Sequence, residues 1–160
     1  MKIPLSILAV LAAAFCSSAS AKEKSDVPRG FVPLAELAEA KKEALEKKRL
    51  IVLVVKGTDD SCPNCVATLG NGTRAVGSDV VKVFTRPAII KAADKKDFGP
   101  ALVQRSAKHF TEGAAVTFVV MDPAMEKIIV EADRGELQDD KKKIAAFKKT
   151  VREAKTALKK

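Results

Sequence analysis

A run of aliphatic residues leading to two closely spaced cysteines is the feature that most constrains the fold of this chain. Residues 50–55 (LIVLVV) are all aliphatic and include three valines, which is typical of a strand buried on both faces. A short polar loop then leads to Cys62-Pro63-Asn64-Cys65, in which Pro63 suits the first turn of a helix. A strand followed by a helix that begins at a Cys-x-x-Cys motif predicts an α/β fold with a redox or metal-binding turn.

Residues 1–21 have the features of a signal peptide. A basic second residue precedes an almost wholly apolar stretch, residues 3–15, and Ala19-Ser20-Ala21 is a small-x-small cleavage site. Cys16 leaves a lipoprotein alternative, in which the mature chain would begin at a lipidated cysteine, but Phe15 is large for the position before it. We therefore expect cleavage after Ala21 and export to the periplasm or out of the cell, where disulfides persist.

Cys62 and Cys65 are the only cysteines beyond that signal. Two thiols cannot complete a four-cysteine zinc site or a framework of structural disulfides, so the count favours redox chemistry. A single structural disulfide between the two cysteines remains an alternative.

Cys62 has the position of a nucleophile. If Pro63 begins a helix, the Cys62 sulfur lies beside unpaired backbone N–H groups and the positive end of the helix dipole, which favours the thiolate. A thiolate attacks a substrate disulfide to form a mixed disulfide, and Cys65, one turn further, can resolve it. Cys62 and Cys65 are therefore the candidate catalytic residues, and this chemistry needs no cofactor.

The rest of the mature chain is expected to be a linker, residues 22–32, followed by one domain, residues 33–160. The net charge of +9 is basic, but 22 of the 29 basic residues are lysines and the chain has no Tyr or Trp to stack on bases. The lysines near the C-terminus follow helical spacing, which indicates a solvated helix face. We expect a monomer with no nucleic-acid partner and no stable membrane insertion.

Periodicity and breaker residues divide the domain into alternating helices and strands. The Gly70-Asn71-Gly72 sequence is interpreted as a turn that ends the second helix near Leu69, and residues 78–85 as a short helix or a strand, with the helix preferred. Residues 115–121 and 127–132 predict an antiparallel hairpin. The predicted helices are 33–49, 63–69, 78–85, 97–110 and 139–158, and the predicted strands are 50–55, 88–92, 115–121 and 127–132.

This order of elements resembles the thioredoxin-like family over roughly residues 33–160. The resemblance rests on LIVLVVKGTDDSCPNC, on AVTFVVMDP followed by KIIVEADRG, and on the amphipathic terminal helix. It implies an α/β three-layer sandwich, with a mixed β-sheet flanked by helices, and an exported thiol–disulfide oxidoreductase. The partners implied are protein thiol or disulfide clients and a redox partner.

The chain departs from the family pattern at three positions. Ser61 replaces the usual Trp before the first cysteine, and Lys56 stands where thioredoxins have a buried acid. Val116, before Thr117, takes the place of the usual cis-proline, and a cis bond there would cost about 3 kcal/mol. The resemblance implies a substrate groove at Val116 and Thr117, whereas the cost of a non-proline cis bond predicts that the peptide bond before Val116 is trans.

A second class of function stays open, in which the chain is a non-catalytic thioredoxin-like binding or metal-handling protein. His109 is the only histidine, and with Cys62 and Cys65 it could form a three-ligand site for copper(I) or zinc. The competing interpretation is an exposed histidine beside Lys108 near the end of a helix.

Overall fold

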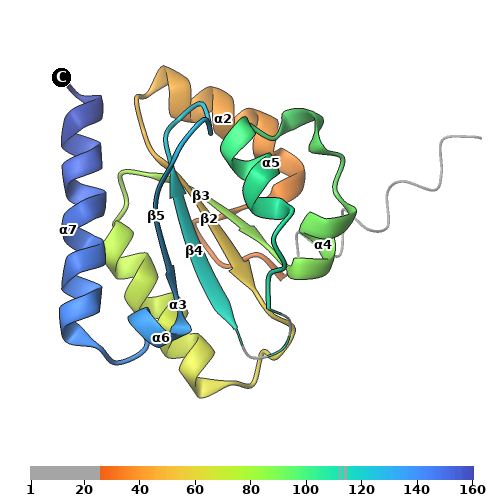
Figure 1. The fold of residues 1–160 in the computed structure, drawn as a ribbon, viewed down its shortest axis with the longest axis vertical. Helices are drawn as coiled ribbons and strands as arrows, with labels where there is room; N and C mark the ends of the chain where they lie inside the picture. The colour runs from red at the N-terminus through yellow and green to blue at the C-terminus, as the bar shows by residue number, and fades with distance from the viewer. Residues whose placement is uncertain (1–25, 112, 114) are drawn as a thin grey trace, which may run out of the picture.

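The sheet at the centre of the molecule is mixed and has five strands in the order β1-β3-β2-β4-β5 (Figure 1). The computed structural model describes residues 26–111, 113 and 115–160, so the predicted signal peptide and Cys16 lie outside the described residues. β2 (Ile51–Lys56) pairs in parallel with β3 (Val81–Thr85), which pairs in parallel with β1 (Val32–Pro33). On its other side β2 pairs antiparallel with β4 (Val116–Met121), and β4 with β5 (Ile128–Asp133), which confirms the predicted hairpin.

Helices cover both faces of this sheet, which confirms the predicted α/β fold. Successive residues of a strand point to opposite faces. Leu53 accordingly packs in one buried cluster, against α2 (Leu37–Glu46), α4 (Pro87–Ala92) and α5 (Pro100–Ser106). Val52 and Val54 pack in the other, with α3 (Pro63–Val76), α6 (Arg134–Leu137) and α7 (Lys141–Leu158). Figure 1 shows α3, α6 and α7 on one side of the sheet and α2, α4 and α5 on the other.

The terminal helix agrees with its predicted pattern. Asp140 caps α7 by accepting hydrogen bonds from the backbone N–H groups of Lys142 and Lys143, both at 3.0 Å. Phe147 and Val151 of its apolar stripe are buried, and Lys148 and Lys149 on its other face are exposed. Lys155 is instead partly buried and donates a hydrogen bond to the Val76 carbonyl at 2.6 Å. Within the described part of the chain, no helix is long and apolar enough to cross a membrane.

At two consecutive segments the predicted type of secondary structure is wrong: the predicted helix is a strand, and the predicted strand is a helix. Residues 81–85 form strand β3 and not the preferred helix, because Val83 and Phe84 are buried on opposite faces between β1 and β2. The predicted strand at 88–92 is helix α4, in which Pro87 occupies the first turn and Ile90 is buried on one side. Short apolar runs do not distinguish a buried strand from a one-sided helix by periodicity alone.

The helix after the cysteines is twice as long as predicted, because α3 continues through Gly70-Asn71-Gly72 to Val76. A Cβ at Gly72 would lie 2.4 Å from the ring of Phe118 in β4, so this glycine permits close packing of helix on sheet. Asn71 does not form a turn, since its side-chain amide donates hydrogen bonds to the backbone carbonyls of Leu137 and Gln138 at 2.8 and 2.7 Å. Contacts distant in sequence therefore override the two local breakers.

The first and fourth predicted helices are shorter than expected. A 3₁₀ turn (Leu34–Glu36) precedes α2, which ends at Glu46, and another (Lys95–Asp97) precedes α5. Pro100 occupies the first turn of α5 and the helix ends at Ser106. Neither β1 nor the one-turn helix α6 was predicted from the sequence.

Candidate functional site

The cysteine pair lies at the start of α3, after the loop that leaves the carboxyl end of β2. Cys62 is the N-cap residue, and its sulfur accepts a hydrogen bond from the backbone N–H of Cys65 at 3.3 Å. Pro63 follows in the first turn, as predicted. Both cysteines are free thiols in this structure. The position predicted for the pair, at the beginning of a helix, is therefore confirmed.

The two thiols have different environments. Cys62 is half-buried, whereas Cys65 is only 1% exposed and belongs to the cluster between α3 and the sheet. The pKa of Cys62 is lowered, because the Cys65 side chain, the backbone N–H groups of Cys65 and Asn64, and the Arg134 side chain donate hydrogen bonds to its sulfur. The pKa of Cys65 is raised, first by burial and then by the neighbouring Cys62. The half-buried Cys62 sulfur therefore ionises more readily than the buried Cys65 sulfur.

Arg134 is a member of the site that sequence reasoning missed. It is the first residue of α6, which follows β5, and its side chain is the smallest of the causes that lower the pKa of Cys62. Its charge also favours the Cys65 thiolate, although burial outweighs that effect. No local signal connects an arginine after the last strand with a cysteine after the second. Only the pairing order of the sheet, which brings the carboxyl ends of β2 and β5 to one side, does so.

An ion-pair network holds the loop before Cys62. Lys56, only 6% exposed, contacts the Asp60 carboxylate and donates to the Asp59 carbonyl at 3.3 Å. Arg86 reaches both carboxylate oxygens of Asp60 at 3.2 and 3.0 Å and donates to the Gly57 carbonyl at 2.8 Å. Hydrogen bonds from Lys56 and Arg86 lower the pKa of Asp60. Lys56 therefore forms a salt bridge with Asp60 that positions the loop between β2 and Cys62.

Gly57 brings this loop against the segment before β4. Its N–H donates to the Ala115 carbonyl at 2.8 Å, and a Cβ on Gly57 would lie 1.8 Å from the Gly113 carbonyl oxygen. Any side chain at Gly57 would therefore displace the strand that begins at Val116. The cysteine loop and the start of β4 are held together by this close backbone contact.

Of the two predicted groove residues, only Val116 lies on the cysteine side of the sheet. Val116 is fully buried in the same cluster as Cys65 and is opposite Lys56 in the β2–β4 register. No peptide bond between described residues is cis, as predicted for the bond before Val116. Thr117, the next residue of the strand, faces the other side, where it lines a polar cleft of about 190 Å³.

His109 does not join the cysteines. It is exposed and lines the same cleft as Thr117, across the sheet from Cys65. Among the described residues, no group of three or more His, Cys, Asp and Glu side chains could hold a metal ion. The three-ligand arrangement considered from the sequence is thus not formed by these residues in this structure.

We expect that His109→Ala leaves the zinc affinity of the reduced protein unchanged, because His109 and the cysteines lie on opposite faces. Competition with a chromophoric zinc chelator measures this affinity, and Cys65→Ser is the comparison that removes a thiol ligand. A tenfold or larger loss in His109→Ala alone would instead favour the metal-handling function.

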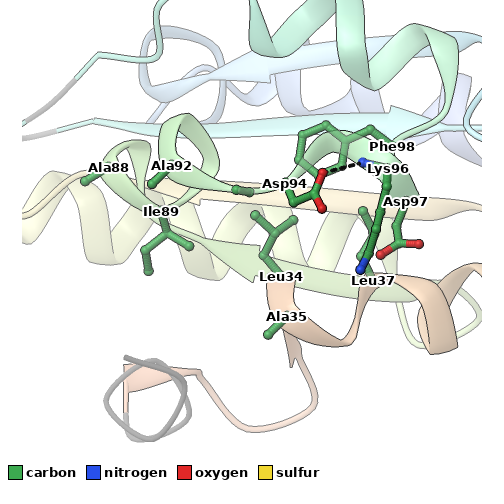
Figure 2. A pocket seen from close by; sticks show the side chains of 11 residues that line it. Leu34, Ala35, Leu37, Ala88, Ile89, Ala92, Asp94, Lys96, Asp97 and Phe98 are labelled. Atoms are coloured by element: carbon green, nitrogen blue, oxygen red, sulfur yellow. Dashed lines mark hydrogen bonds between the residues drawn. The ribbon is translucent and has the colours of Figure 1, made fainter. Parts of the chain in front are cut away.

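An apolar pocket of about 560 Å³ lies away from the cysteines (Figure 2). Leu34, Leu37, Ile89 and Phe98 are among its apolar lining residues. Asp94, which also lines it, accepts a hydrogen bond from the Lys96 N–H at 3.2 Å. These apolar residues belong to or pack against the cluster on the α2 face of the sheet. The pocket is therefore separated from the cysteine pair by the sheet.

Comparison with known proteins found no match, whether among protein-family models, curated proteins or solved structures. The chemistry of the cysteine site is accordingly inferred from its own residues.

Proposed function

We propose that this protein is an exported thiol–disulfide oxidoreductase of thioredoxin-like fold that acts through Cys62 and Cys65. The observation that carries this proposal is the position of Cys62 at the N-cap of α3. Its half-exposed sulfur accepts the Cys65 N–H there, and the buried Cys65 lies one turn away. This is the arrangement that an attacking thiolate and a resolving thiol require.

The mixed sheet with helices on both faces, and the cysteine pair after its central strand, support the thioredoxin-like assignment. Export is proposed from residues 1–21. Protein clients suit the surface beside the pair, because Val66, one residue after Cys65, is 59% exposed and could contact an unfolded apolar segment. Val116 is proposed to form part of the floor of the substrate groove, since it is buried in the same cluster as Cys65.

The reaction transfers electrons between sulfur atoms alone. The Cys62 thiolate attacks one sulfur of a client disulfide, forms a mixed disulfide and expels the other client sulfur as a thiolate. Cys65 then loses its proton and attacks the Cys62 sulfur, which closes the Cys62–Cys65 disulfide and releases the second client thiolate. The client gains two electrons and the pair loses two, and every step is reversible.

The test is a redox titration of the mature protein in glutathione buffers, with the disulfide located by mass spectrometry. We expect one reversible two-electron transition between a Cys62–Cys65 disulfide and two thiols, together with exchange activity on a dithiol or disulfide peptide. A protein that stays oxidised throughout and shows no exchange would have only a structural disulfide.

A further inference from the structure

We propose that the outward side of α7 is a docking surface for membranes rich in anionic phospholipid, which it binds through its charges without inserting into the bilayer. This basic face consists of five exposed residues of α7: Lys141, Lys142, Lys148, Lys149 and Arg152. The inference goes beyond the proposed function and does not depend on the chemistry of the cysteine pair.

Nearly all of the net charge of the chain lies at its C-terminal end. Residues 141–160 contain nine basic residues and one acidic residue, so they carry +8 of the total net charge of +9. Residues 1–140 contain 20 basic and 19 acidic residues and are close to neutral. Because charges of both signs offset one another in the rest of the chain, the positive potential of the molecule is concentrated around α7.

Helical spacing gathers these charges on one side of α7. Lys141, Lys148 and Arg152 are separated by 7 and 4 residues, which is about two turns and one turn, so they lie along one line. Lys142 and Lys149 form a second line beside the first. The helix has 18 residues and is therefore about 27 Å long. Charges arranged along one side of a straight helix can all approach a flat surface at once.

The opposite side of α7 is already packed on the domain. Phe147 and Val151 are buried, and the Phe147 ring packs edge-on against Phe118 of β4, with the ring centroids 6.3 Å apart. Figure 1 shows α7 on the outside of the fold, beside α3. The basic face therefore points away from the sheet and is open to a partner.

Contacts inside the protein leave most of the basic face without a counter-charge. Lys141, Lys142, Lys148 and Arg152 form no ion pair with any described residue. Lys149 lies 3.8 Å from Glu153, but the two side chains are 68% and 63% exposed, and an exposed pair of this kind interacts weakly. The charges of this face are therefore available to anionic groups outside the protein.

The composition of the basic face favours lipid headgroups over nucleic acid. Four of its five residues are lysines, which act as point charges, whereas arginine is the residue preferred in nucleic-acid recognition. Phe147, the one aromatic residue of α7, is buried and cannot stack on bases.

The same face lacks the residues that would enter the acyl layer. α7 has no exposed large hydrophobic side chain, so adsorption depends on charge alone. The attraction between basic residues and anionic headgroups increases with each lysine or arginine near the surface and decays within a Debye length. Binding through this face should accordingly be strong at low salt and lost at high salt.

The experiment measures cosedimentation of the mature protein with vesicles of equal parts phosphatidylglycerol and phosphatidylcholine, and with vesicles of phosphatidylcholine alone. The variant combines Lys141→Gln, Lys148→Gln and Arg152→Gln, which removes three charges from one line of the basic face. The matched control combines Lys91→Gln, Lys95→Gln and Lys96→Gln, which removes three exposed charges from α4 and the 3₁₀ turn after it. Thermal unfolding checks that each protein folds.

Wild type should bind the phosphatidylglycerol vesicles at about 0.1 M salt and be released at about 1 M salt, where the Debye length is about 3 Å. The α7 variant should lose at least about tenfold in apparent affinity, since each basic residue near the surface contributes to binding. The control variant should remain within about twofold of wild type, because its charges lie on the other side of the sheet.

Lysine acetylation of the wild type provides a second test that needs no variant. Phosphatidylglycerol vesicles should slow acetylation of Lys141 and Lys148 at least about threefold at 0.1 M salt, and Lys95 and Lys96 should react as they do without vesicles. Mass spectrometry of tryptic peptides measures each rate.

Equal binding of wild type to the two kinds of vesicle would overturn the proposal. Equal losses in the two triple variants, or equal protection of all the lysines, would show attraction to net charge and would overturn the role of the basic face. Tighter binding to duplex DNA than to phosphatidylglycerol vesicles at the same salt would overturn the choice of lipid. None of these outcomes bears on disulfide exchange, so the proposed function is tested separately.

Discussion

Cys62→Ser is expected to reduce disulfide exchange to the background rate, whereas Cys65→Ser should retain the first attack and accumulate a mixed disulfide. A hydroxyl cannot form the disulfide intermediate, so loss of Cys62 removes the nucleophile itself. Without Cys65 nothing resolves the intermediate. Mass spectrometry of each variant after incubation with a disulfide-bonded peptide distinguishes the two outcomes.

The same variants measure the asymmetry of the pair. At pH 7, we expect Cys62 in the Cys65→Ser variant to react with iodoacetamide at least about tenfold faster than Cys65 in the Cys62→Ser variant. Cys62 is half-exposed with a lowered pKa, while Cys65 is 1% exposed with a raised pKa. The serine in Cys65→Ser keeps a donor near Cys62, so the comparison does not remove that hydrogen bond. Equal rates, or an adduct trapped on Cys65, would contradict the assigned roles.

Gly72→Ala is expected to destabilise the protein by up to about 2 kcal/mol, although alanine favours a helix over glycine by about 1 kcal/mol. The added Cβ would lie 2.4 Å from the Phe118 ring, which is fully buried and packs edge-on against Phe147 at 6.3 Å. Overpacking of this kind costs about 1–3 kcal/mol and outweighs the helix propensity. Urea denaturation followed by circular dichroism measures the free energy of unfolding.

Gly70→Ala is the matched control in the same helix. A Cβ at Gly70 would meet only the Arg74 guanidinium, at 3.9 Å, which is an ordinary contact. This substitution should therefore stabilise the protein by about 0.5–1 kcal/mol through helix propensity. If both substitutions stabilised it, α3 would not pack on the sheet at Gly72 as described.

Elements with strong local signals could be predicted from the sequence. The aliphatic run of β2 indicates a strand buried on both faces, and the 3–4 spacing of apolar residues with an Asp cap indicates α7. Pro63 after Cys62 indicates a helix start, because proline suits a position whose N–H has no partner. These signals were sufficient for the α/β class and for the place of the cysteine pair, since each depends on residues adjacent in the chain.

Only the tertiary structure decided features that depend on distant partners. Residues 81–85 are a strand because β1 and β2 pair with them, and α3 continues through Gly72 because Phe118 lies against it. The sheet places Val116 on the cysteine side and Thr117 on the other, because neighbouring strand residues face opposite ways. Strand pairing also places Arg134, which contributes to the lowered pKa of Cys62, at the same end of the sheet as the cysteine pair, and the sequence carries no local record of that order.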